Sequence, residues 1–239
     1  MENIKEKLEY NYIINNNKSF IENYPISIPH KFKNFYDIEI SAFLTSIISF
    51  GRRDIIFNKC DQLMKLMNNK PYGYVMNGDF GNLKGFKHRT IKDTDMMYYM
   101  RSLRYIYSNY GGLEIFFTND IRNSLIRFWK IFFSLEHEQR CEKHISNVEK
   151  NSAAKRLNMF LRWMVRDDEI DFGLWKNIDK SKLYIPLDAH VGNVSRELGL
   201  LTRTQNDWKS VVELTNNLKK MDSQDPIKYD IALFTLDAN

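Results

Sequence analysis

The sequence predicts an all-α fold, and three observations support that prediction. Apolar residues recur three and four positions apart along most of the chain, which is the spacing of one helix face. No segment alternates apolar and polar residues for long enough to predict a sheet. The 239 residues include only 10 Gly and 5 Pro, which is too few for a loop-rich sandwich.

Each expected helix has a periodic face or a terminal signal. The first covers residues 37–50, whose apolar face is followed by Gly51 as a stop signal. Asp54 is expected to cap the next helix, and Ser152 is expected to cap a helix over residues 152–166. The other expected helices cover residues 94–109, 120–140, 188–201, 206–220 and 226–236.

Two segments interrupt this series. Residues 71–92 are rich in glycine, and we expect a loop with one short helix there. Residues 167–187 are the best candidate for a boundary between two helical halves, and we expect those halves to pack together.

Charge and cysteine content narrow the class of protein. The 35 Lys and Arg exceed the 30 Asp and Glu, and the net charge of +5 permits a nucleic-acid partner without requiring one. Two Cys exclude a disulfide scaffold, a four-Cys iron–sulfur cluster and a Cys₄ zinc site. We expect a cytoplasmic protein, because no apolar run reaches the length of a membrane span and the first residues lack a signal peptide's apolar core. We also expect a monomer.

Two residues beside expected helix starts could carry chemistry. Lys155 lies in the opening turn of its helix, where the helix dipole should lower the pKa of the amine and favour Schiff-base chemistry. Asp188 precedes the next helix, where free N–H groups stabilise a carboxylate. The competing interpretations are an ordinary exposed lysine and a simple helix cap.

Asp230 and Phe234 are four positions apart and therefore share one face of the last expected helix. The carboxylate could accept hydrogen bonds from the edge of a heterocycle while the ring stacks on its face. The alternative is a core phenylalanine beside a solvated or ion-paired aspartate.

Three further clusters have weaker signals. The turn SFGRRD sets Phe50 beside Arg52 and Arg53, a combination suited to phosphate contact or to insertion into a base stack, or to an exposed basic turn. The second cluster is a trio on one expected helix face, which could bind a metal but lacks a fourth ligand: His137, Cys141 and His144. The third cluster is an acidic run that is better explained as a charged loop: Asp167, Asp168, Glu169 and Asp171. We therefore expect no metal and no other cofactor.

The order of these motifs resembles the helix-hairpin-helix DNA glycosylase superfamily. The segment IPLDAHVGNVSRELGLL resembles the motif that supplies the catalytic Asp, here Asp188. Lys155 precedes it by 188 − 155 = 33 residues, a spacing similar to that of the archaeal-type 8-oxoguanine DNA glycosylases. The segment DPIKYDIALF resembles their base-pocket helix, and SAAKRLNMFLRW resembles the lysine helix of a related branch. The resemblance begins near residue 30, and it is strongest to an uncharacterised bacterial family of that superfamily.

The resemblance implies two packed helical subdomains with a cleft between them. Residues 31–170 would form one, and residues 1–30 with 171–239 would form the other. It also implies excision of an oxidised purine such as 8-oxoguanine from double-stranded DNA in base excision repair, with AP lyase activity, in the cytoplasm at the nucleoid. Lys155 would be the nucleophile and Asp188 its catalytic partner. The base pocket would consist of Asp230, Phe234, Met159 and Trp163, and the DNA contacts would come from Phe50, Arg52, Arg53, Ser152 and His190.

One departure keeps an alternative open. The hairpin before the lysine is usually L-P-G-[IV]-G in that superfamily, but here it reads ISNVEKNSAAK and has no glycine. Glycine allows the backbone to approach a phosphate closely. The alternative is therefore a catalytically inactive helical module that binds modified or distorted DNA. An all-α interaction protein with no nucleic-acid role is a third interpretation.

Overall fold

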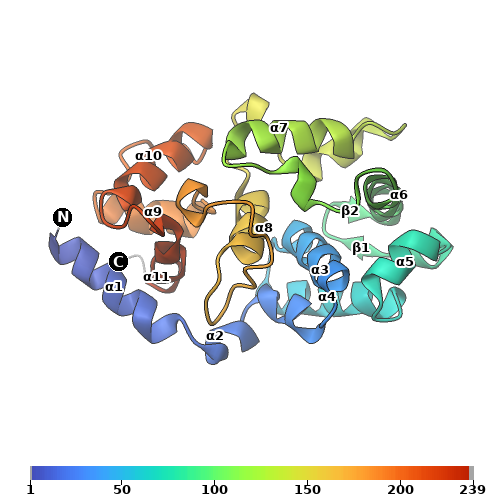
Figure 1. Cartoon of the computed structure of the whole chain (residues 1–239), viewed down its shortest axis with the longest axis horizontal. Helices are drawn as coiled ribbons and strands as arrows, with labels where there is room; N and C mark the ends of the chain where they lie inside the picture. The colour runs from blue at the N-terminus through green and yellow to red at the C-terminus, as the bar shows by residue number, and fades with distance from the viewer. Residues whose placement is uncertain (1, 237–239) are drawn as a thin grey trace.

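The computed structural model describes residues 2–236 and confirms the all-α prediction (Figure 1). Its α-helices are α1 (Glu2–Asn15), α2 (Lys18–Glu22), α3 (Phe35–Ile48), α4 (Arg53–Leu66), α5 (Pro71–Asn77), α6 (Asp93–Tyr110), α7 (Ile121–Phe132), α8 (Lys155–Val165), α9 (Ala189–Glu197), α10 (Trp208–Lys219) and α11 (Tyr229–Thr235). Short 3₁₀ turns are η1 (Pro25–Ser27), η2 (Pro29–Lys31), η3 (Phe80–Leu83), η4 (Glu114–Phe116), η5 (Gln139–His144), η6 (Val148–Lys150), η7 (Lys180–Lys182) and η8 (Pro226–Lys228). The strands β1 (Lys87–His88) and β2 (Ile91–Lys92) form a small antiparallel hairpin.

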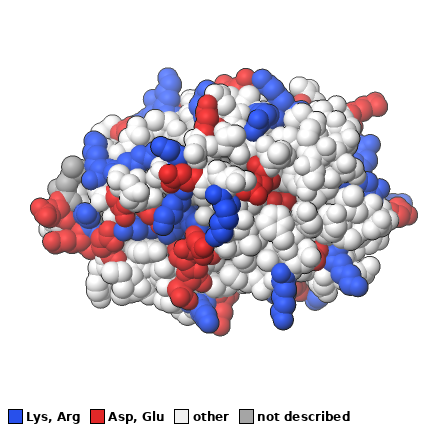
Figure 2. All heavy atoms as spheres, viewed as in Figure 1, with Lys and Arg blue, Asp and Glu red and all other residues white. Residues whose placement is uncertain are grey.

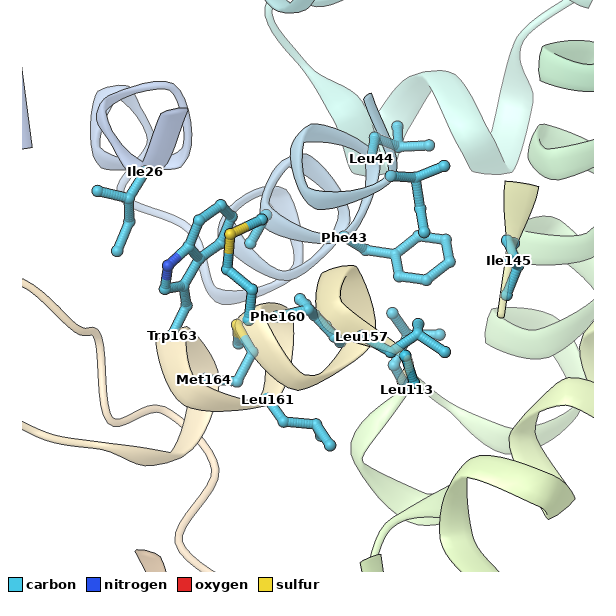
Figure 3. Packing of buried hydrophobic residues seen from close by; sticks show 14 of the residues in the cluster. Ile26, Phe43, Leu44, Leu113, Ile145, Leu157, Phe160, Leu161, Trp163 and Met164 are labelled. Atoms are coloured by element: carbon cyan, nitrogen blue, oxygen red, sulfur yellow. The ribbon is translucent and has the colours of Figure 1, made fainter. Parts of the chain in front are cut away.

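Helices α3 and α8 pack against each other at the centre of the molecule. The rings of Phe43 and Phe160 lie between them, 5.5 Å apart and edge to face. Figure 3 shows these rings in the core and Trp163 extending from α8 toward Ile26. Residues 157–165 of α8 are buried, so the core holds in place the helix that Lys155 begins.

A buried carboxylate links this core to three other segments. Glu39 of α3 accepts hydrogen bonds from the Tyr107 hydroxyl, from Leu113 N at 3.1 Å and from Trp175 Nε1 at 2.7 Å. Burial raises the pKa of Glu39, and the three hydrogen bonds counteract that rise. The Glu39 carboxylate therefore has a structural role, because it holds three segments to α3 inside the protein.

Helix α1 is absent from the sequence prediction. It packs along α11, so the two ends of the described chain lie side by side (Figure 1). Leu8 is its one fully buried side chain, and this single anchor explains why no apolar stripe predicted the helix.

Two predicted caps are wrong, because α4 begins earlier and α8 begins later than their sequence signals suggested. Helix α4 begins at Arg53 after Arg52, so Asp54 lies inside the first turn and does not cap it. Helix α8 begins at Lys155, and its N-cap is Ala154 rather than Ser152. The expected helix 120–140 also stops early, since α7 ends at Phe132.

The core is continuous across the expected boundary at 167–187. One hydrophobic cluster includes residues from Leu8 to Leu233. The division into residues 31–170 and residues 1–30 with 171–239 stays a prediction, and residues 1 and 237–239 lie outside the described chain. Among residues 2–236, no helix is both long and apolar enough to cross a bilayer.

Candidate active site

A cavity of about 710 Å³ opens beside the first turn of α8. Its walls come from the segment between α2 and η1, the α3–α4 turn, α8, the segment before α9, and α11. The cavity contacts the expected site residues Lys155, Asp188, Asp230, Phe234, Met159, Trp163, Phe50 and Arg53. The structure thus gathers in one place side chains that are far apart in the sequence.

Lys155 and Asp188 face each other across this cavity. Lys155 Nζ lies 3.8 Å from Asp188 Oδ2, and the two side chains are 26% and 29% exposed. Asp188 caps α9 as predicted, because its Oδ1 accepts a hydrogen bond from Val191 N at 3.0 Å. The cap fixes the carboxylate with its second oxygen turned toward the amine.

The pKa of Lys155 is lowered, as expected, but burial is the principal cause. The carboxylates of Asp188 and Asp230 act in the opposite direction, and the guanidinium groups of Arg156 and Arg162 add to the lowering. A lysine under these opposing influences can supply a neutral amine more readily than one in water.

Asp230 is buried at the inner wall of the cavity. Its Oδ2 accepts from Arg162 Nη1 at 2.5 Å, and Arg162 also lies 3.2 Å from Asp171. Burial raises the pKa of Asp230, while Arg162 and Lys155 lower it. The guanidinium of Arg162 therefore compensates an otherwise isolated buried charge and holds the carboxylate in place.

Aromatic side chains form part of the cavity wall. Phe234 meets Tyr24 edge to face at 5.3 Å, and Tyr24 stacks on Phe20 at 3.8 Å. The Arg53 guanidinium lies 4.7 Å from the centroid of the Tyr24 ring. The cavity is thus suited to a flat, partly apolar ligand that has a polar edge.

Phe50 of the α3–α4 turn and Arg53 at the start of α4 lie at the rim of the cavity, but Arg52 does not. Arg52 points elsewhere and makes an exposed ion pair with Asp54, 2.9 Å from Nη2 to Oδ2. Arg156 lies over the Phe50 ring at 4.9 Å and donates to the Ile47 carbonyl at 2.6 Å.

Ser152 and His190 are also absent from the cavity lining. The backbone of Ser152 pairs with that of Asp207 in an isolated antiparallel β-bridge, and Ser152 Oγ accepts a hydrogen bond from Ala154 N at 3.3 Å. The His190 ring lies against Phe234 at 5.9 Å, so it supports the pocket wall from behind.

The glycine-free hairpin still makes tight turns. Asn151 and Ala154 adopt left-handed backbone conformations, with φ of 60° and 49°. Such conformations usually call for glycine. The segment before α8 therefore turns sharply just before Lys155, although the side chains of Asn151 and Ala154 make these backbone conformations sterically unfavourable.

The other candidate clusters have structural partners. His137 is 3.3 Å from Glu142, and the Cys141 thiol donates to Asp95 at 3.1 Å. These residues do not share one α-helical face, because residues 139–144 form the 3₁₀ turn η5. Among residues 2–236, no three or more His, Cys, Asp or Glu side chains are placed to hold a metal ion together.

Sequence reasoning missed two contributors to the cavity. The N-terminal wall, with Phe20 and Tyr24, comes from a segment that carries no catalytic motif. The second is Arg162, which the sequence prediction included in the lysine-helix segment without a role of its own. Its position gives a signal, because a charged residue three positions after Met159 on an apolar helix face indicates a buried ion pair.

One family model covers most of the chain. The model of a family described as "Protein of unknown function (DUF2400)" matches residues 24–239. No curated protein and no solved structure matches the chain.

Proposed function

We propose that this chain, which belongs to the DUF2400 family of proteins of unknown function, is a DNA glycosylase with AP lyase activity. Its substrate would be an oxidised purine such as 8-oxoguanine in duplex DNA, and its fold would be of the helix-hairpin-helix glycosylase type. The observation that supports this proposal is the convergence of Lys155, Asp188 and Asp230 in one cavity with an aromatic wall.

The cavity would receive a base that has been flipped out of the DNA stack. Asp230 would accept hydrogen bonds from the N1–H and N2–H₂ donors of a guanine-like edge. The Arg162 ion pair uses Oδ2, which leaves Oδ1 for the base. Phe234, Met159 and Trp163 would contact the face of the base.

Lys155 would act as the nucleophile. Its neutral amine attacks C1′ while the C1′–N9 bond breaks, and the purine leaves with the electron pair and takes up a proton. The new C–N bond leaves a proton on the lysine nitrogen, and Asp188 would accept that proton. Opening of the sugar then gives the Schiff base from which the strand can be cleaved. The Asp188 carboxylate would also stabilise positive charge that develops on the sugar.

The second candidate function is a catalytically inactive module that recognises modified or distorted DNA. The absence of glycine before α8 favours it. The ion pair between Lys155 and Asp188 inside a cavity weighs against it, because binding alone does not require an amine there.

The test is borohydride trapping on a duplex that contains 8-oxoguanine. We expect the wild-type protein to form a covalent adduct and Lys155→Ala to form none. Lys150→Ala is the matched control, since Lys150 is an exposed lysine on the same approach to α8. It should trap as the wild type does.

Asp188→Asn provides the second arm of the test. It should retain DNA binding and lose turnover, because amide nitrogen and oxygen keep the shape but cannot accept the proton. An adduct with Lys155→Ala, or no adduct with the wild type, would overturn the proposal. DNA binding without any turnover would instead support the inactive module.

A further inference from the structure

The small hairpin of β1 and β2 packs directly on the cavity rim. His88 Nε2 donates to the Phe50 carbonyl at 3.1 Å, and the two rings meet at 4.9 Å. Arg89 lies over the Phe50 ring at 5.6 Å. A Cβ on Gly51 would come within 2.6 Å of Arg89 Nη1, so the hairpin and the α3–α4 turn fit closely together.

Arg89 occupies a backbone conformation that is costly for it. It begins the turn between the strands with φ of 51°, where glycine would be unstrained. In this region the Cβ of a side chain crowds the following carbonyl oxygen, which glycine avoids. A strained residue with a long cationic side chain, beside a candidate active site, suggests a role for that side chain.

The hairpin also sets two lysines opposite each other. Lys87 and Lys92 are cross-strand partners, and both are exposed. Like charges at facing positions destabilise a strand pair. Within residues 2–236, none of the three cations Lys87, Lys92 and Arg89 forms an ion pair.

The neighbouring acidic groups already have other partners. Asp93 accepts from the backbone N–H groups of Gly85 and Thr94, at 2.7 and 2.8 Å. Asp95 is paired with Arg140 at 2.5 Å. On the face of the molecule drawn in Figure 2, by comparison, basic and acidic side chains lie next to one another. The three hairpin cations are therefore exposed and have no carboxylate paired with them among residues 2–236.

We propose that Lys87, Arg89 and Lys92 form a hairpin cation strip that binds the backbone phosphates of duplex DNA. These phosphates would flank the nucleotide whose base enters the cavity, because Arg89 and the rim residue Phe50 are in contact. This inference rests on DNA being the partner in the proposed function, but it does not depend on the excision chemistry. Arg and Lys are the usual donors to phosphate oxygens, and such contacts position a protein on DNA without reading its sequence.

The experiment measures affinity for an undamaged duplex by fluorescence anisotropy at several salt concentrations. Each phosphate contact contributes about 0.9 to the slope of log K against log salt. The combined variant Lys87→Gln, Arg89→Gly and Lys92→Gln should reduce that slope by about 2.7. Glycine at position 89 suits the left-handed backbone, so the turn is kept.

Two further variants keep the test decisive. Lys87→Gln with Lys92→Gln leaves the turn unaltered and should reduce the slope by about 1.8. The combined variant Lys5→Gln, Lys7→Gln and Lys18→Gln removes the same charge from exposed positions on α1 and α2, and its slope should match that of the wild type.

The outcomes separate this inference from the proposed function. Equal slopes for the hairpin variants, the α1–α2 control and the wild type would overturn the cation strip, even if borohydride trapping succeeds. A reduced slope in the hairpin variants alone would support it, even if trapping fails. Absence of salt-dependent DNA binding by the wild type, or a stronger affinity for duplex RNA, would also overturn it.

Discussion

Lys155 is held between a desolvating cavity and two carboxylates. Burial favours its neutral form, whereas Asp188 and Asp230 favour its charged form. Of these two carboxylates, Asp188 is the one that forms an ion pair with Lys155, with 3.8 Å between Nζ and Oδ2. If the negative charge of Asp188 is removed, less should therefore counteract the lowering of the Lys155 pKa by burial.

We predict that Asp188→Asn lowers the pKa of Lys155 further below its ordinary value. The amine should then react at a lower pH than in the wild type. Competitive acetylation at a series of pH values, read out by mass spectrometry of the peptide that contains Lys155, measures this shift without any DNA. Lys150, which is exposed, serves as the internal reference. An unchanged or higher midpoint for Lys155 would show that Asp188 does not control the amine.

Sequence reasoning found Lys155 and Asp188 because each stands beside a helix start within a few residues of its signal. It failed for Ser152, since α8 begins three residues later and Ala154 takes the cap position. It also did not foresee that Arg162 holds Asp230, because those residues are 230 − 162 = 68 positions apart. Local patterns identify residue types, but partners so distant in sequence depend on the packing of whole helices.

At the scale of elements, Arg166 joins the end of α8 to two loops. Its Nη1 contacts Asp168 at 2.8 Å and Asp171 at 2.6 Å, and its Nε contacts Asp225 at 2.9 Å. Arg166 is 1% exposed. Two members of the acidic run after α8 thus belong to a buried ion-pair network, and their positions depend on Arg166. This network also reaches the segment that leads into α11.

We predict that Arg166→Met lowers the free energy of unfolding by about 3–5 kcal/mol. Removing the guanidinium takes away the group that three carboxylates share, and it leaves Asp171 with Arg162 at 3.2 Å and Asp225 with Lys180 at 3.3 Å. Deleting one partner of a buried ion pair is the most costly way to break it. Urea denaturation followed by circular dichroism measures the change. Arg52→Met is the matched control, because Arg52 forms an exposed pair with Asp54 and should change stability by less than about 1 kcal/mol. Similar losses in both variants would contradict the buried-network interpretation.

Sequence periodicity predicted α3, α6, α8, α9 and α10 close to their observed bounds, because each has an apolar stripe or a clear terminal signal. The β1–β2 hairpin escaped detection, since strands of two residues are too short for alternation to show. Helix α1 escaped for a different reason, as Leu8 alone anchors it deeply.

At the scale of the whole molecule, the cavity depends on the meeting of the two chain ends. Helix α1 lies along α11, and Glu9 accepts from the Tyr229 hydroxyl at 2.5 Å and pairs with Lys228 at 2.8 Å. The segment after α1 then supplies Tyr24 to the cavity wall that α11 completes with Phe234. The N-terminal helix α1 therefore helps to fix the position of α11, although it has no residue in the cavity.

We predict that Leu8→Ala loosens α1 and α11 together. Truncating a fully buried leucine costs about 2–5 kcal/mol, and the loss should fall on the elements that pack around it. Hydrogen exchange measured by mass spectrometry should show faster exchange in peptides from α1 and α11, with α6 and α7 unchanged. Ile13→Ala is the matched control on the same helix, since Ile13 is 69% exposed and should leave exchange as it is. If α1 alone exchanges faster in Leu8→Ala, α1 is an independent appendage, and α11 is held by its other neighbours, α9 and η8.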